Sequence, residues 1–273
     1  MKNLFLKGAL LLALPLIINS CKKKDDTPAI TIVKEWTVAL SAKNENPAPA
    51  GRNETGTATF KLMSNNSLMY NFSVSNLASG DALTAAHFHS GNAGVNGGVI
   101  LGFDPTFNGS AASGTILNVR QSLVDSLKSD ANEIYFNVHS SQVGSGIVRS
   151  QINTKVEVAM DVALSGSNEV PAIVTTATGV ARLRVTADKK LYYIITVGTL
   201  QATDALLFAH IHRGAVGVNG AVLLTMAAAA GDFGINKAIA LDDATYTSMK
   251  NDALYVNAHS TLYASGVVRG QIR

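Results

Sequence analysis

The sequence predicts an all-β protein made of two tandem β-sandwich domains, each with one short helix. Three observations predict this fold class: the chain repeats itself after about 120 residues, short segments alternate between apolar and polar residues, and turn-forming residues separate those segments. Alternation with a period of two is typical of a half-buried β-strand. A unit of about 120 residues with several such strands is typical of a β-sandwich and is long enough to bury its own core.

The repeat is clearest in the segment Ala86–Gly97, AHFHSGNAGVNG, which returns as AHIHRGAVGVNG in Ala209–Gly220, 123 residues later. A third histidine follows in each half, within the motif Asn-x-His-Ser. All six histidines of the chain therefore fall into two equivalent sets, which are His87, His89 and His139, and His210, His212 and His259. We expect the first domain to span residues 32–153 and the second to span residues 154–273.

The N-terminal segment has the pattern of an export signal. Lys2 and Lys7 precede an apolar run, Gly8–Ile18, that is 11 residues long, which is the size of a signal-peptide core and too short to span a membrane. Cys21, the single cysteine, follows directly and resembles the lipid-modified cysteine of bacterial lipoproteins. We expect a signal peptide over residues 1–20, a tether over residues 21–31 and a lipoprotein held in the outer membrane, facing the periplasm or the cell exterior.

The charge balance argues against nucleic acid as a partner. The whole chain has 22 Lys and Arg against 19 Asp and Glu. The leader and tether account for five lysines and two aspartates, which leaves 17 basic and 17 acidic residues in the folded region. A nucleic-acid-binding protein requires a basic surface to neutralise phosphates, so we expect no nucleic acid partner.

The expected strands follow in order along each half. Glu35–Leu40 alternates in character and ends in a turn-rich stretch, and Leu68–Val74 gives the clearest period-two signal. The His-x-His segment is the next strand. Since residues two apart share a face of a strand, His87 and His89 should lie together, with Ala86 and Phe88 pointing into the core. The glycine-rich stretch after them turns the chain into another apolar strand.

Each half then contains a helical segment and a final hairpin. Leu123–Lys128 and Asp242–Lys250 carry the best helical pattern of the two halves. Tyr135–His139 and Ile147–Ile152 are separated by a glycine- and serine-containing turn, which favours a β-hairpin. In the first of these strands Tyr135, Asn137 and His139 share one face.

These motifs together resemble a known family. Asn-Glu-x-Pro near the start, His-x-His-x-Gly-x-x-Gly-x-Asn-Gly in the middle and Gly-x-Val-Arg-x-Gln-Ile at the end of each half resemble the CHRD domain, the module named after chordin. In the first copy Ser150 stands where the pattern has glycine, as Gly270 does in the second. The resemblance implies an extracellular binding module; in chordin such modules belong to an antagonist that binds growth factors. We expect two tandem Ig-like or Cu/Zn-dismutase-like β-sandwiches.

The two histidine sets leave two interpretations open. Two histidines on one strand face and a third from another strand are able to hold one zinc or copper ion. Alternatively, the histidines are neutral members of a polar network that ties the strands to the glycine-rich loop. The expected network members are Asn96, Asn137 and Arg149 in the first half and Asn219, Asn257 and Arg269 in the second.

Enzymatic activity is not expected. The His-x-His strand resembles that of Cu/Zn superoxide dismutase, but that site needs more than three histidines, and the stabilising cysteine pair is missing. The recurrent acids Glu45/Glu169 and Asp81/Asp204 lie beside turns, where stabilising the turn is their commoner role. The sequence therefore predicts a non-enzymatic, membrane-anchored binding or scaffold protein with a protein or glycan partner, or alternatively a metal-binding protein with zinc or copper in each half.

Overall fold

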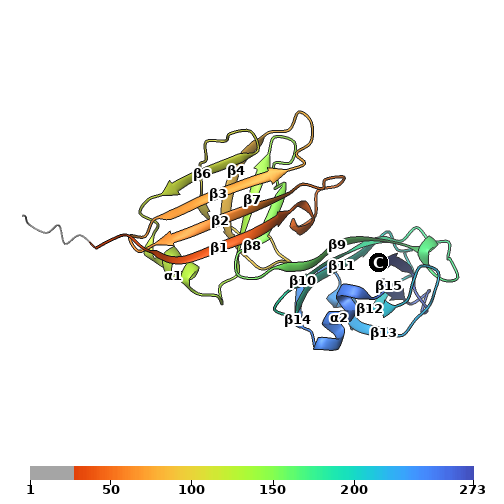
Figure 1. Cartoon of the computed structure of the whole chain (residues 1–273). Helices are drawn as coiled ribbons and strands as arrows, with labels where there is room; N and C mark the ends of the chain where they lie inside the picture. Colours follow the sequence, from red (N-terminus) through yellow and green to blue (C-terminus); the bar gives the residue numbers. More distant parts are fainter. Residues whose placement is uncertain (1–27) are drawn as a thin grey trace, which may run out of the picture. The chain divides into compact units, whose positions relative to one another are not determined.

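The first half of the chain forms one eight-stranded antiparallel sheet (Figure 1). The computed structural model describes residues 28–273, so the expected signal peptide and Cys21 lie outside the described residues. The strands of this first domain are β1 (Ile32–Ser41), β2 (Thr55–Met63), β3 (Leu68–Ser75), β4 (Leu83–Ser90), β5 (Val99–Gly102), β6 (Ala111–Ile116), β7 (Ile134–Ser140) and β8 (Val148–Gln151). Helix α1 (Gln121–Lys128) precedes β7, and a 3₁₀ turn, Ala42–Asn44, follows β1.

The second half repeats this arrangement in a second eight-stranded sheet. Its strands are β9 (Val156–Ser165), β10 (Thr178–Thr186), β11 (Lys190–Gly198), β12 (Leu206–Arg213), β13 (Val222–Ala227), β14 (Lys237–Ala240), β15 (Leu254–Ser260) and β16 (Val268–Gln271). Helix α2 (Asp243–Asn251) precedes β15, and the 3₁₀ turns are Gly166–Asn168 and Ala230–Asp232. Within residues 28–273, no helix has both the length and the apolar character needed to cross a membrane.

Each sheet bends back on itself to give two layers. The strand order of the first sheet is β5-β4-β7-β8-β1-β2-β3-β6, and β8 pairs with β1 at Ser41 and Arg149 alone. The sheet folds at this weak junction, so that β1, β2 and β3 lie side by side in one layer and β4 and β7 in the other (Figure 1). Phe60 of β2 packs across the layers against Phe88 of β4 and Phe136 of β7, with ring centroids 4.8 and 5.0 Å apart. The predicted tandem β-sandwich fold is confirmed.

The period-two pattern decides which side chains enter this core. In β3 the residues Leu68, Tyr70, Phe72 and Val74 are buried while those between them are exposed. In β4, Ala86 and Phe88 are at most 1% exposed and belong to the hydrophobic core. His87 and His89 alternate with these two residues and therefore lie on the opposite face of the sheet, as predicted.

The two predicted helices are also confirmed, each with bounds within two residues of the expected segment. Helix α1 buries Leu123, Val124 and Leu127 against the core. This amphipathic spacing explains why the segment is helical although the rest of the domain is β-structure.

Candidate functional site

The three histidines of each domain converge on the outer face of the sheet. Strands β4 and β7 are antiparallel neighbours, and their register places Ala85 opposite His139 and His87 opposite Asn137. This pairing brings one ring nitrogen from each of His87, His89 and His139 within 4.8 Å of the others. Strands β12 and β15 assemble the same cluster from His210, His212 and His259. We call these clusters the first and second histidine trios.

Backbone carbonyl groups fix the orientation of two rings in the first trio. His89 Nδ1 lies 2.9 Å from the Gly97 carbonyl oxygen, and His139 Nδ1 lies 2.9 Å from the Gly144 carbonyl oxygen. A carbonyl oxygen only accepts, so each Nδ1 carries the proton and each Nε2 keeps its lone pair. The second trio repeats this with His212 on Gly220 and His259 on Ala264, both at 2.9 Å. Histidine ligands of metals are commonly held by such a second hydrogen bond.

The spacing of the nitrogens suits a small metal ion. His87 Nδ1 donates a hydrogen bond to His139 Nε2 at 2.9 Å, and His210 Nδ1 donates one to His259 Nε2 at 3.4 Å. Because zinc–nitrogen bonds are about 2.0–2.1 Å, two nitrogens on one tetrahedral zinc are roughly 3.3 Å apart. The remaining histidine nitrogen of each trio lies within 4.8 Å of these two.

Burial lowers the pKa of several histidines in the two trios. The pKa of His87 is lowered from its ordinary value by burial and by the neighbouring His139 and His89. Burial likewise lowers the pKa of His210 and of His259. These rings are therefore neutral at pH 7, which is the form that binds a metal.

One buried nitrogen in each trio has no hydrogen-bond partner within the described residues. His89 Nε2 and its counterpart His212 Nε2 are both buried and both unpaired within the described residues. Leaving a buried acceptor unsatisfied costs about 1–3 kcal/mol. The same nitrogen is unpaired at the equivalent place in both domains, and so is the amide oxygen of Asn137 in the first domain and of Asn257 in the second.

One histidine of each trio belongs to a stack with a tyrosine and an arginine. His89 lies flat on the ring of Tyr135, and the guanidinium of Arg149 lies 3.5 Å from the centroid of the same ring on its other side. Arg149 is 1% exposed and Tyr135 is 3% exposed, so the stack is buried. The second domain builds the same stack from His212, Tyr255 and Arg269.

The arginine of this stack holds the glycine-rich loop in place. Arg149 donates to Asn96 Oδ1 at 3.0 Å and to the carbonyl oxygens of Asn92 and Val95 at 2.6 and 3.0 Å. The equivalent hydrogen bonds in the second domain join Arg269 to Asn219, Ala215 and Val218. In both domains these hydrogen bonds go to amide and carbonyl oxygens of the loop.

A buried carboxyl group lies behind each trio. Glu45 and Glu169 are 5% and 8% exposed, and Asn257 Nδ2 lies 3.3 Å from both carboxyl oxygens of Glu169. Burial raises the pKa of Glu45 to about 8, against the opposing effects of Arg149 and Asn137. Burial raises the pKa of Glu169 to about 7, against Asn257 and Arg269. Asn137 and Asn257, which lie on the same strands as His139 and His259, thus connect each of these strands to a buried carboxyl group with a raised pKa.

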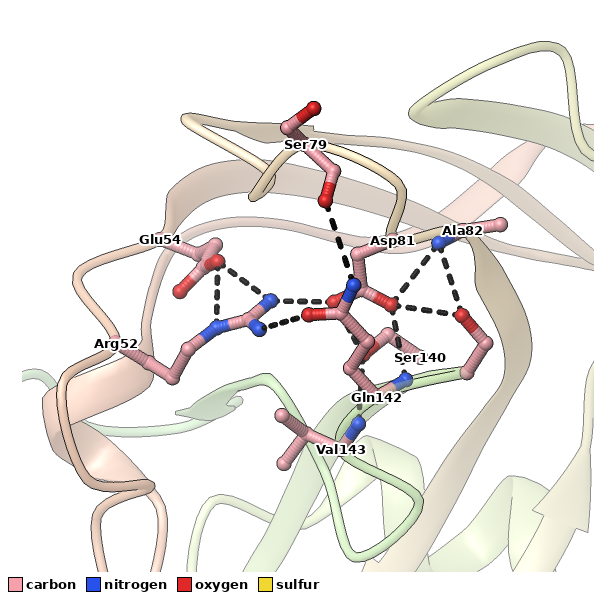
Figure 2. Close-up of polar contacts among 9 residues, drawn as sticks. Arg52, Glu54, Ser79, Asp81, Ala82, Ser140, Gln142 and Val143 are labelled. Atoms are coloured by element: carbon pink, nitrogen blue, oxygen red, sulfur yellow. Dashed lines mark hydrogen bonds and ion pairs between the residues drawn. The ribbon is translucent and has the colours of Figure 1, made fainter.

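The other recurrent acid, Asp81, anchors the end of the strand that carries His139 (Figure 2). Its side chain accepts hydrogen bonds from Ser140 Oγ at 2.8 Å and from the Gln142 backbone at 3.0 Å, and it forms an ion pair with Arg52. Arg52 also donates to Glu54 at 2.9 Å. The side chain of Asp81 is fully buried, and these donors hold its pKa well below the usual range. Asp81 is therefore a structural anion of the first domain.

The sequence indicates the trios and their asparagine and arginine neighbours, but it does not indicate the burial of Glu45 or the stacking of Tyr135. The sequence indicates a turn residue at Glu45, whereas its burial comes from contact with residues far along the chain. The glycine at position 146 is the one sequence feature that relates to this burial. A Cβ there would lie 2.6 Å from both Glu45 Oε1 and Asn137 Nδ2, so no larger residue fits beside the buried carboxyl group. Tyr135 lies on the predicted face, but its stack with His89 depends on the pairing of β4 with β7.

The comparisons with known proteins agree with the repeat. The CHRD domain matches residues 36–152 and again residues 160–272. No curated protein and no solved structure matches the chain.

Proposed function

Because the chain belongs to the CHRD domain family, with one copy of the domain in each half, we propose that it is a binding protein whose two domains each hold one transition-metal ion. The ion is bound by the three histidines of each trio. Zinc and copper are the metals that suit three imidazole ligands. Each site offers three protein ligands.

One observation carries this proposal: the same convergence of three imidazoles occurs twice in one chain. The two copies differ in many surrounding residues, yet both keep the carbonyl groups that orient two of the three rings. Both also keep one buried, unpaired nitrogen. A metal ion held by the trio would supply a partner for this nitrogen.

The experiment that tests this function is metal analysis of the purified full chain together with two single-site variants. The wild type is expected to bind two zinc or copper ions per chain after dialysis against the metal. His89→Ala and His212→Ala are each expected to bind one. Each variant is the control for the other, since both remove one imidazole from an equivalent position in an equivalent domain.

A thermal measurement adds an independent check. A ligand that binds only the native state stabilises it by about 2.7 kcal/mol when present at 100 times its dissociation constant. The wild type should therefore melt at a higher temperature with zinc or copper than with a chelator. Equal melting temperatures, together with less than one bound ion per chain, would exclude the metal function.

We also propose that the protein is anchored to a membrane outside the cytoplasm. The support is in the sequence: a short apolar leader precedes Cys21, the only cysteine, and a charged tether follows it. A lipid on Cys21 would hold both domains at the outer membrane, facing the periplasm or the cell exterior. Cys21→Ser should move the protein from the membrane fraction to the soluble fraction, and an unchanged distribution would contradict the anchor.

A further inference from the structure

The two trios have different surroundings at one position. Residue Ala85 of β4 corresponds to Phe208 of β12, at the same offset of 123 residues that relates the His-x-His motifs. Ala85 lies opposite His139 in the sheet. The difference therefore stands directly beside the third histidine of each trio.

Phe208 packs against two of the three rings in the second trio. Its ring centroid lies 4.5 Å from that of His259 and 5.2 Å from that of His210, with interplanar angles of 39° and 41°. Alanine has no side-chain atoms beyond Cβ, so the equivalent side of the first trio lacks this cover. Aromatic packing of this kind excludes water from the rings that it touches.

The exposure of the third histidine follows this difference. His259 is 7% exposed, whereas His139 is only partly buried. The change is local, because the comparison reverses at the other end of the trio: His89 is buried and His212 is partly buried. The side chain at position 85 or 208 thus controls access to one side of each site.

The open side of the first trio also has an acid nearby that the second lacks. A Cβ on Gly102 would lie 3.8 Å from Asp104 Oδ1 and 4.0 Å from His87 Cδ2, so the carboxylate and the imidazole border the same space. Asp104 is exposed and has a φ of +42°, an unusual backbone conformation for a residue other than glycine. The corresponding residue of the second domain is Ala227, which is fully buried.

We propose that the two metal sites differ in function: the first keeps an open coordination position for water, which a small anion can replace, and the second is closed by Phe208. This inference rests on the proposed metal binding. Metal sites that bind a substrate keep one position for water or substrate, while structural sites are closed by protein. Asp104 would accept a hydrogen bond from the bound water at the open site. Reversible binding of small ligands would then be confined to the first domain.

The test uses cobalt as the metal, azide as the ligand, and the full chain. The two single-site variants separate the domains: His212→Ala keeps only the first trio, and His89→Ala keeps only the second. Each is loaded with Co²⁺ and titrated with azide while the visible absorption of the cobalt is recorded. The spectrum of the first site should change when azide is added. The second site should bind azide at least about tenfold more weakly, and a tenfold difference corresponds to about 1.4 kcal/mol.

Reciprocal substitutions then test the cause. Phe208→Ala, combined with His89→Ala, should make the second site respond to azide as the first does. Ala85→Phe, combined with His212→Ala, should remove the response of the first site while cobalt stays bound. Equal azide affinity at both sites, or a response that ignores these substitutions, would overturn the inference. Absence of cobalt binding in every variant would instead refute the proposed metal function itself.

Discussion

The imidazole of His89 lies parallel to the phenol ring of Tyr135, with ring centroids 4.8 Å apart and an interplanar angle of 5°. His212 and Tyr255 repeat this relationship with the same distance and angle. Since Arg149 occupies the other face of Tyr135, the tyrosine connects the histidine site to the arginine that holds the glycine-rich loop. The stack thus couples the position of a candidate metal ligand to the packing of the domain.

The first prediction concerns this stack. Tyr135→Leu should lower the metal affinity of the first site by about 10-fold to 100-fold, the range found for residues that orient metal ligands. It should also destabilise the domain, by about 2–4 kcal/mol, because a buried ring is lost and Arg149 loses its partner. Isothermal titration with zinc measures the affinity. Tyr135→Phe keeps both stacking faces and removes only the hydroxyl group, which accepts a hydrogen bond from the Gly97 N–H at 3.2 Å. It should therefore bind zinc more tightly than the leucine variant, and equal affinities of the two variants would contradict the role of stacking.

The second prediction concerns the buried carboxyl groups. The pKa of Glu45 is raised from 4.5 to about 8 and that of Glu169 to about 7. Between about pH 5 and pH 8 the folded state therefore retains protons that the unfolded state has released, and the free energy of unfolding falls as the pH rises. Glu45→Gln with Glu169→Gln should remove this loss, on the order of a few kcal/mol.

Urea unfolding at a series of pH values measures this effect. The double variant should be more stable than the wild type at about pH 8, and the two should converge near pH 5. Glu35→Gln is the control, since Glu35 is an exposed strand residue. Because the histidines with lowered pKa values are present in both proteins, the difference between them isolates the carboxyl groups. A double variant no more stable than the wild type at about pH 8 would show that the two carboxyl groups are not held neutral in the folded protein.

The sequence pattern identifies some strands of the fold and not others. The alternation in β3 and β4 is sufficient to place Leu68, Phe72 and both histidines of β4 on the correct faces, because a strand allows only two directions. Strand β2 is not identified from the sequence, although Ala58, Phe60 and Leu62 alternate with other residues and are fully buried. Strand β6, with its sequence Ala-Ala-Ser-Gly-Thr-Ile, has too little apolar alternation to be recognised.

The candidate site likewise has features that the sequence predicts and features that it does not. The trios are predictable because two histidines share a strand face and the third recurs with them. The environment of Glu45 and the contact of Phe208 with His259 arise between residues far apart in the sequence. No local pattern encodes such contacts, and they depend on strand pairing and on the bend at Ser41 and Arg149.

The third prediction concerns the anion at the end of β7. Asp81→Asn removes the charge that Arg52 pairs with and weakens the hydrogen bonds from Ser140 and the Gln142 backbone (Figure 2). Breaking one partner of a buried ion pair is strongly destabilising, so we expect a loss of about 3–5 kcal/mol. Calorimetry of the full chain measures the change.

The second domain supplies the control for this prediction. Asp204 accepts hydrogen bonds from Thr261 Oγ1 and the Leu262 backbone, both at 3.0 Å, but the residue corresponding to Arg52 is Thr175. Asp204→Asn should therefore cost less than Asp81→Asn. Equal losses would mean that Arg52 contributes nothing to the stability of the first domain.

The last prediction concerns Gly97, whose carbonyl oxygen lies 2.9 Å from His89 Nδ1. A Cβ at this position would lie 1.4 Å from the Ser90 carbonyl oxygen, a distance that no packing tolerates, so Gly97→Ala must displace the loop and its carbonyl group. The neighbouring Gly98 is exposed, and a Cβ on it would meet nothing within 4 Å, which makes Gly98→Ala a control one residue away. Gly97→Ala should weaken zinc binding at the first site by about 10-fold or more, because His89 loses the acceptor that fixes its tautomer, and Gly98→Ala should leave it unchanged. Titrations in the His212→Ala background isolate the first site, and equal affinities of the two alanine variants would show that the Gly97 carbonyl group does not orient His89.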